Sequence, residues 1–172
     1  MRLPLQLHPQ SRCSAVIRIE VDIARHAALL LSFHVTGNIG DLRLPPIAVA
    51  ERADELWRHS CFEAFIRPVP GEAYYEVNVA PSSQWAAYRF DAYRNGMRTA
   101  TGIAAPRIEV TSAPERYTLH AALELGGPTG VPWRLGLAAI IEEADGRLSY
   151  WALAHPAGKP DFHRADCFTC EI

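Results

Sequence analysis

The 172-residue sequence lacks several features that would assign it to a common functional class. Its 17 basic and 19 acidic residues give a net charge of -2, so there is no basic excess to neutralise the phosphates of a nucleic acid. No run approaches the roughly twenty apolar residues of a membrane-spanning helix. The first residues carry no continuous apolar stretch of the signal-peptide type, and we therefore expect a cytoplasmic protein.

Cysteine is also scarce, with four residues in the chain. Cys167 and Cys170 are spaced like half of a zinc site, but Cys13 and Cys61 are too far apart to supply the second pair. A strand over residues 166–172 would place Cys167 and Cys170 on opposite faces, where they cannot chelate one ion. In a reducing compartment we expect four free, buried thiols.

The chain has no Pro/Ser-rich linker, no internal repeat and no low-complexity tract. Hydrophobic residues make up 49% of the sequence and charged residues 21%, which suits a full-sized core and argues against disorder. We therefore expect residues 1–172 to form one domain.

The strongest pattern in the sequence is the alternation of apolar and polar residues. The clearest runs cover residues 17–23, 27–35, 117–125 and 133–141, and shorter ones cover 61–67, 74–80, 84–91, 106–111, 148–154 and 166–172. Strands of this length between Gly-, Pro- and Asn-containing turns predict an all-β fold with little helix. We expect an antiparallel β-sandwich of immunoglobulin-like or jelly-roll type, with residues 47–57 as an irregular excursion containing one turn of helix.

The alternating runs also predict which side chains form the core. The inward-facing set is expected to be Ile17, Ile19, Leu29, Leu31, Phe33, Phe62, Val77, Leu119, Leu123, Leu135 and Leu137.

A hairpin closed by residues 68–73 predicts a face that mixes charged and aromatic side chains. Pairing Phe62 with Val79 gives one apolar face, and the same register places Glu63 opposite Asn78 on the other. A third strand is expected to extend this second face. The expected members of the face are Glu63, Phe65, Arg67, Tyr74, Glu76, Asn78, Trp85 and Arg89, with Tyr88 and Phe90 on the apolar side.

This mixture is typical of sites that bind sugars. An aromatic ring covers the apolar C–H face of a sugar, while carboxylates, amides and guanidinium groups bind its vicinal hydroxyls. The alternative is an ordinary solvated sheet face with cross-strand ion pairs, such as Arg67 with Glu76.

A second group of polar residues lies between Ser149 and His163. Asp161 and His163 are two apart, so an extended backbone would point both the same way, and with His155 they could bind a ligand or a divalent metal. The alternative is a loop in which Asp161 accepts hydrogen bonds from neighbouring amides. Because no strong ligand motif is present, we assign no metal site.

Several of these segments resemble the DOMON-like domains, a superfamily related to the family-nine carbohydrate-binding modules. The motifs E-x-F and E-x-N-x-A-P-S of that group are matched by residues 63–65 and 76–82, and residues 160–163 (Pro-Asp-Phe-His) are similar to its small bacterial branch. The resemblance covers residues 56–95 and 148–168, and the N-terminal strands match in pattern.

The resemblance implies an immunoglobulin-like or jelly-roll sandwich that binds a sugar or haem. The chain departs from the group in two respects. Family-nine modules are usually secreted and attached to glycosidases, whereas we expect this chain to be a stand-alone domain without an export signal. Haem-binding members use a methionine and a histidine as axial ligands, and here the one internal methionine, Met97, lies in a turn, which argues against haem.

Our leading hypothesis is a non-catalytic domain that binds a carbohydrate or similar polyhydroxylated small molecule, with no cofactor, catalytic residue, nucleic-acid partner or membrane partner. The expected ligand-binding residues are Trp57 or Trp85 for stacking, Glu63, Glu76 and Asn78 for the hydroxyls, Arg58 or Arg89 for the polar clamp, and His155, Asp161 and His163 from the second group. The first alternative is a glycoside hydrolase that uses Glu63 and Glu76 at diagonal cross-strand positions. The second is a haem-binding or protein-interaction domain.

Overall fold

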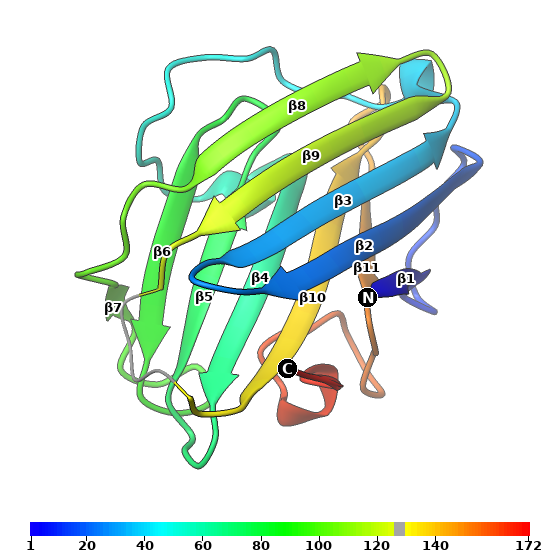
Figure 1. Cartoon of the computed structure of the whole chain (residues 1–172). Helices are drawn as coiled ribbons and strands as arrows, with labels where there is room; N and C mark the ends of the chain where they lie inside the picture. Colours follow the sequence, from blue (N-terminus) through cyan, green and yellow to red (C-terminus); the bar gives the residue numbers. More distant parts are fainter. Residues whose placement is uncertain (126–129) are drawn as a thin grey trace.

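The computed structural model describes residues 1–125 and 130–172, which form an antiparallel β-sandwich (Figure 1). The strands are β1 (Arg2–Leu7), β2 (Ile17–Arg25), β3 (Leu29–Gly37), β4 (Cys61–Pro68), β5 (Tyr74–Val79), β6 (Trp85–Phe90), β7 (Arg98–Thr99), β8 (Arg107–Ala113), β9 (Arg116–Leu123), β10 (Trp133–Glu142), β11 (Leu148–Ala152) and β12 (Cys170–Glu171). The 3-10 helices are η1 (Ile39–Asp41), η2 (Leu56–Arg58) and η3 (Ala165–Cys167). Within these ranges no helix has the length and apolar character to span a membrane. The predicted fold class is confirmed.

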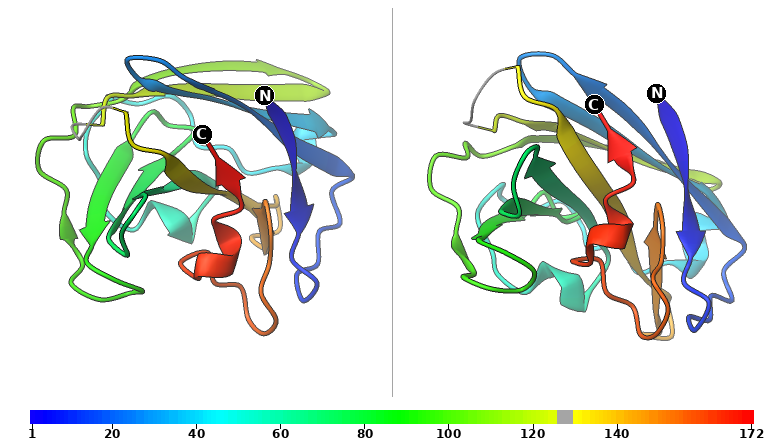
Figure 2. Two further views of the ribbon diagram at one scale, coloured as in Figure 1. Left: turned by 60° about the horizontal axis from the view of Figure 1, so that its bottom comes forward. Right: turned by 90° about the horizontal axis from the view of Figure 1, so that it is seen from below.

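The strands form one continuous sheet that curls into two layers. Sheet A has the order β2-β3-β9-β8, and sheet B has the order β7-β6-β5-β4-β10-β11, with β12 beside β10. Strand β1 joins them, because Arg2–Leu5 pair with β2 while Gln6 and Leu7 pair with β11. Figure 2 shows the two layers facing each other with β1 at the side where they meet.

The space between the layers is filled by the alternating apolar side chains. All eleven residues predicted as core are buried, which confirms the inward face of each run. Aromatic rings link the layers at the centre, where the Phe33 and Phe62 centroids lie 5.0 Å apart and Tyr117 stacks on Phe62 at 6.1 Å. Burial of the inward side chains of both sheets is what holds the sandwich closed.

The predicted hairpin register of β4 and β5 is confirmed. Phe62 pairs with Val79, and Glu63 pairs with Asn78. Period two therefore sends Glu63 and Asn78 to the outer face of sheet B while Phe62 and Val79 enter the core.

The prediction for the third strand is wrong by one residue. Val79 pairs with Trp85, so Trp85 joins the core and is 9% exposed, and Arg89 pairs with Tyr75 on the same side of the sheet. The tight connection between β5 and β6 sets this register, with Ser83 in the left-handed region at φ 72°. Tyr88 and Phe90 take the outer positions that Trp85 and Arg89 were expected to occupy.

Two further segments differ from expectation. Residues 166–172 form only the short strand β12 after η3, because the chain turns at Ala165 to cover sheet B. Strand β1 was not predicted, although Leu3, Leu5 and Leu7 alternate, and it contains a proline. As expected, residues 47–57 contain no long helix and lead into the single turn η2.

A second hydrophobic cluster covers the outer face of sheet B. Its buried members are Phe65, Tyr74, Ala86, Tyr88, Phe90, Ala138, Ile140, Ala152, Phe162, Cys167 and Phe168. Close approach of the covering segment depends on Gly136, because a Cβ there would lie 3.2 Å from the carbonyl oxygen of Cys167. Sheet B is thus buried on both faces.

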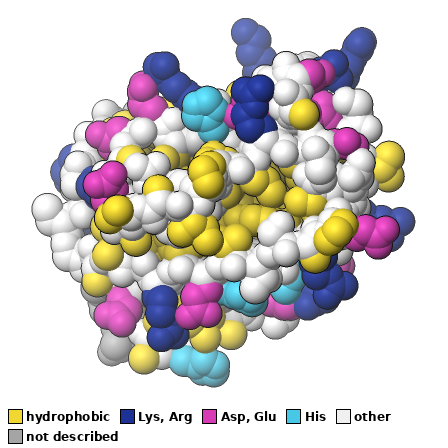
Figure 3. Space-filling model, turned by 90° about the horizontal axis from the view of Figure 1, so that it is seen from above, with side chains coloured by type: hydrophobic (Ala, Val, Ile, Leu, Met, Phe, Trp, Pro, Cys, Tyr) yellow, Lys and Arg dark blue, Asp and Glu magenta, His cyan; other side chains and the backbone are white. Residues whose placement is uncertain are grey.

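The end of the sandwich at the top of Figure 1 has a different character. The connection from η1 to η2 runs across it, and Ile47 and Val49 on this connection are exposed. Figure 3 views this end from above and shows hydrophobic side chains gathered around a hollow.

Candidate ligand-binding pocket

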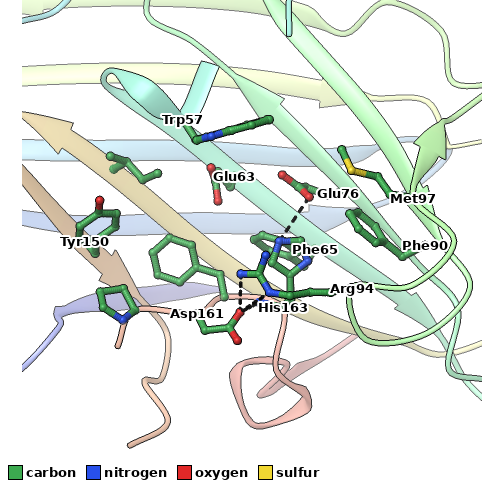
Figure 4. A pocket seen from close by; sticks show the side chains of 13 residues that line it. Trp57, Glu63, Phe65, Glu76, Phe90, Arg94, Met97, Tyr150, Asp161 and His163 are labelled. Carbon is green, nitrogen blue, oxygen red and sulfur yellow. Dashed lines mark hydrogen bonds and ion pairs between the residues drawn. The ribbon is translucent and has the colours of Figure 1, made fainter. Parts of the chain in front are cut away.

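A pocket of about 390 Å³ opens on the outer face of sheet B, within the second hydrophobic cluster. It is lined by Trp57, Glu63, Phe65, Glu76, Phe90, Arg94, Met97, Ile140, Tyr150, Pro160, Asp161, Phe162 and His163 (Figure 4). Its volume falls near the lower end of the roughly 300–1,000 Å³ of small-molecule sites.

The sheet leaves room for this pocket by placing small residues beside the acidic ones. In the row of paired strands through Glu63 the outer positions are Ala86, Asn78, Glu63, Ala138 and Ala152. The three alanines are buried and rise little above the backbone, so the Glu63 carboxyl group faces open space rather than packed side chains. The alternation of the strand directs the Glu63 side chain to the outer face, and the small alanine side chains beside it leave room for the pocket.

Glu63 is the most unusual group in the pocket. Its side chain comes from β4, the residue is 3% exposed, and its carboxyl group has no hydrogen-bond partner in residues 1–125 or 130–172. Burial raises the pKa of Glu63 well above its ordinary value, and the neighbouring charge of Glu76 adds to the effect. The charge of Arg94 acts in the opposite direction but does not cancel the rise.

Glu76 lies diagonally from Glu63 on β5 and is 4% exposed. The Nδ2 group of Asn78 donates to its Oε1 atom at 2.8 Å. Burial raises the pKa of Glu76, against the opposing effects of the Asn78 hydrogen bond and the Arg94 charge. The Oδ1 atom of Asn78 is buried and has no partner in the described part of the chain, so an acceptor is left unused beneath the pocket.

His163 closes the side of the pocket beside Glu76. Its Nδ1 atom is 2.8 Å from the Tyr74 hydroxyl group, which also accepts a hydrogen bond from the backbone N–H of Arg94. The tautomer that uses the hydroxyl proton accepts it at Nδ1 and carries its own proton on Nε2, 3.7 Å from Oε2 of Glu76. Burial, followed by the charge of Arg94, lowers the pKa of His163 to about 4, so its ring is neutral at physiological pH.

Asp161 joins two loops at the rim. Arg94 donates to its Oδ1 atom from Nη2 at 2.8 Å and from Nε at 3.2 Å, and the Tyr93 hydroxyl donates to Oδ2. The backbone N–H of His163 also donates to Oδ1, which is the local amide contact considered from the sequence. Burial opposes ionisation of Asp161, yet the hydrogen bonds from Tyr93 and Arg94 lower its pKa.

Aromatic side chains make much of the rest of the lining. Trp57 stands on η2 with its ring edge-on to Tyr88, and the ring centroids are 6.3 Å apart. Phe65 lies in the floor with its centroid 5.1 Å from that of His163, and Tyr150 enters from β11. Rings beside carboxyl groups can pack on the apolar faces of a ligand while the acids bind its polar groups.

The structure brings five of the ten residues expected to bind ligand to the pocket wall. These are Trp57, Glu63, Glu76, Asp161 and His163, and Asn78 supports Glu76 from below. Asp161 and His163 reach the pocket from a turn and not from the extended backbone that was expected.

The other four residues lie elsewhere. Arg58 is exposed and pairs with Glu55, while Trp85 and Arg89 belong to the core side of β6. The Nε2 atom of His155 is bonded at 2.7 Å to the carbonyl oxygen of Gln6 and is directed at the β1 backbone. These four residues are separated from the pocket by register or by the loop path.

Sequence reasoning missed Arg94, Met97, Phe90 and Ile140. Arg94 lay in an Arg-Asn-Gly segment interpreted as a turn, and it does adopt φ 50° there, with Gly96 at φ 68°. A charged residue in a left-handed turn could have been flagged, because that conformation aims the side chain out of the regular sheet pattern.

Two cofactor possibilities can be tested on this geometry. Among the described residues, no three or more His, Cys, Asp or Glu side chains are arranged to hold a metal ion, and all four cysteines are free. Met97 and His163 both line the pocket and are residue types that bind haem iron. However, Nδ1 of His163 is engaged by Tyr74 and Nε2 faces Glu76, so the pocket does not fit a haem with this axial ligand.

Comparison with solved structures shows where this fold has been seen before. A protein from Bacteroides uniformis ATCC 8492 named as a "putative carbohydrate-binding protein" superposes with a TM-score of 0.70 at 14% identity, over 98% of this chain and 84% of that one. A family-nine carbohydrate-binding module from Caldicellulosiruptor kristjanssonii, solved with cellotriose, superposes with a TM-score of 0.53 at 13% identity, over 90% and 74%.

Sequence comparison adds no closer relative, since no family model and no curated protein matches the chain. At the identities found, the structural likeness establishes the fold. The chain shares the sandwich of family-nine carbohydrate-binding modules.

Proposed function

We propose that the pocket on sheet B binds a carbohydrate or similar polyhydroxylated small molecule, and that the protein does not turn it over. The observation that carries this proposal is the convergence of two buried carboxyl groups, Glu63 and Glu76, beside an aromatic wall that includes Trp57. The structural neighbours named for carbohydrate binding support it.

The arrangement favours binding over hydrolysis. A retaining glycosidase needs one ionised carboxylate as nucleophile beside one protonated acid, so the environments of its two carboxyl groups push their pKa values apart. Here burial raises the pKa of both Glu63 and Glu76. The net effect of the protein surroundings is therefore in the same direction for both carboxyl groups, toward the protonated form.

We also propose that the chain is a DOMON-like domain. The glutamates of the two motif segments, together with Phe65 and Asn78, lie side by side on one face of β4 and β5. These motif residues line the pocket or, in the case of Asn78, support Glu76 from below.

The proposal is tested by screening neutral mono- and disaccharides with thermal shift and isothermal titration calorimetry. A binding sugar is expected to stabilise the folded state in proportion to its occupancy. Trp57→Ala and Glu76→Gln are expected to weaken that binding about tenfold or more, through lost stacking and a lost hydrogen bond to the carboxyl group.

Arg58→Ala is the matched control, because Arg58 neighbours Trp57 on η2 but does not line the pocket. It should bind as the parent does. Unchanged affinity in both Trp57→Ala and Glu76→Gln would show that the sugar binds elsewhere, and turnover of a sugar substrate would overturn the non-catalytic assignment.

A further inference from the structure

The charges of the pocket are unbalanced. Its lining holds three carboxyl groups, those of Glu63, Glu76 and Asp161, and one guanidinium group, that of Arg94. Arg94 donates from Nε and Nη2 to Asp161, so this cation is already matched by an acid. His163, the remaining basic side chain of the lining, is neutral at physiological pH. Glu63 and Glu76 are left without a matching positive charge.

Glu63 in particular has nothing to bind within the protein. It is 3% exposed, no described group donates a hydrogen bond to it, and it is directed into the cavity (Figure 4). A buried carboxylate without a partner is strongly unfavourable in a folded protein. A neutral sugar can offer hydroxyl donors but no compensating charge.

The walls around this acid suit a cation. Trp57, Phe65 and Tyr150 present aromatic rings to the same cavity. The faces of such rings attract ammonium groups, most strongly where water is excluded. Carboxyl groups and aromatic rings together form the surroundings in which proteins bind amines.

We propose that the ligand of this pocket carries a protonated amine, as an amino sugar does, and that Glu63 is its counter-ion. This inference rests on the proposed function and narrows it to one class of polyhydroxylated molecule. The amine supplies the positive charge that the pocket lacks, and the hydroxyls of the same molecule reach Glu76 and the rim. Binding makes the charged form of Glu63 more favourable and so lowers the pKa that burial has raised, which shifts the carboxyl group toward proton release as the amine enters.

The groups whose titration bears on this step come from every element around the pocket. They are Cys61 and Glu63 on β4, Tyr74 and Glu76 on β5, Arg94 between β6 and β7, Tyr150 on β11, and Asp161 and His163 before η3. Burial raises the pKa of the Cys61 thiol and the Tyr74 hydroxyl, so neither competes as an anion at neutral pH.

The experiment compares matched sugars by calorimetry at neutral pH and low salt. Glucosamine is paired with glucose, galactosamine with galactose and mannosamine with mannose, and the N-acetyl forms serve as uncharged controls of similar size. In at least one pair the amine is expected to bind about tenfold more tightly than its neutral partner. Repeating that titration in two buffers of different ionisation enthalpy should show release of a proton.

Glu63→Gln keeps the shape of the side chain and removes its charge. It is expected to bring the amine and the neutral sugar to within about twofold of one another and to abolish the proton release. Glu63→Asp, which keeps the charge, should retain part of the preference. Glu109→Gln on the exposed strand β8 is the matched control and should bind as the parent does.

Failure of this inference can be told apart from failure of the proposed function. Equal binding of the amine and the neutral sugar, sensitive to Trp57→Ala, would overturn the amine preference and leave the sugar site standing. A preference for the amine that persists in folded Glu63→Gln would overturn the role of Glu63. If no sugar of either kind binds, the proposed function itself is wrong.

Discussion

The two sheets of the sandwich carry similar residue types on their outer faces, but in different surroundings. On sheet A, Asp22, His34 and Thr118 form a connected row, in which His34 lies 3.0 Å from Asp22 Oδ2 and 3.3 Å from Thr118 Oγ1. On sheet B, Glu63 and Glu76 occupy equivalent outward positions, yet both are buried. The sheet A groups bind one another, and the Asp22 side chain remains 38% exposed, while the Glu63 carboxyl group faces a cavity.

The difference comes from a covering layer. Residues 160–168 and the loop that carries Arg94 pack over sheet B and are joined to each other by Asp161, whereas nothing in the described chain covers β2, β3 and β9 on the outside. A polar face becomes a site only when something excludes water from it, since exclusion is what strengthens the remaining interactions. The comparison teaches that the covering segment, more than the polar residues, distinguishes a site from a surface.

The largest effect is expected from removing Phe65, the aromatic ring of sheet B against which residues 160–168 pack. Phe65 is 1% exposed and packs on Phe162, His163 and Phe168. Phe65→Ala is expected to reduce the free energy of unfolding by about 3–5 kcal/mol and to abolish ligand binding. Urea unfolding measures the first effect. Leu30→Ala, on the outer side of sheet A at 39% exposed, should cost about 1 kcal/mol or less, and equal losses in both variants would contradict the distinction between the faces.

Acid should affect the two faces unequally. The pKa of His163 falls from 6.5 to about 4 in the folded state, so the unfolded chain binds more protons between these values. The stabilising effect of neutral His163 is therefore complete above pH 6.5 and lost as the pH falls to 4, by at most about 3 kcal/mol. As the pH falls from 6.5 to 4, the difference in free energy of unfolding between the parent and His163→Asn should therefore decrease. Urea titrations at each pH measure this difference.

Leu30→Ala, which changes a non-titrating side chain on the outer side of sheet A, provides the control for this pH effect. The difference in stability between the parent and Leu30→Ala should stay constant to within about 0.5 kcal/mol over the same range. If the free energies of unfolding of the parent and His163→Asn changed in parallel with pH, the covering layer would not exclude water from His163.

The smallest effect is expected on the open face. Hydrogen bonding to Arg2, against some desolvation, lowers the pKa of Asp22 to about 2 from 3.8, but its side chain is 38% exposed. Asp22→Asn is expected to cost no more than about 1 kcal/mol, because water screens such pairs. Since the pKa is depressed on folding, this contribution is present above pH 3.8 and disappears toward pH 2. Thermal melts in about 1 M salt should show a smaller loss, and a loss that salt does not change would mean that the pair is shielded from solvent.

The sequence predicted most of the strands and the β4–β5 register for a physical reason. A slip of one residue would put Phe62 and Val79 on opposite sides of the sheet and expose the apolar set of one strand. The apolar pattern did not determine the β5–β6 register in the same way. Both faces of β6 carry large side chains, such as Trp85 and Tyr88, so either register satisfied the pattern, and the conformation of Ser83 decided between them.

The pocket could be predicted only in part. Glu63 and Glu76 were found because they share a face of one hairpin, which is a local property. Arg94 and Asp161 meet across 67 residues through two irregular loops, and irregular loops have no period from which a direction can be inferred. The burial of the face was equally hidden, because β2 and β3 alternate as cleanly as β4 and β5 and remain uncovered.

Strand β1 makes closure of the sandwich depend on a pairing between distant parts of the chain. Its second half pairs with β11, where Gln6 meets Ala152, so the seam that closes the sandwich joins positions far apart along the chain. Such distant pairings form slowly, because a long loop must close before any contact is gained. Tyr150 of the pocket wall lies on β11, and residues 160–163 follow this strand in the sequence. Because Tyr150 also pairs with Ile140 on the neighbouring strand β10, the seam adds a distant pairing to a pocket wall that a local pairing already positions.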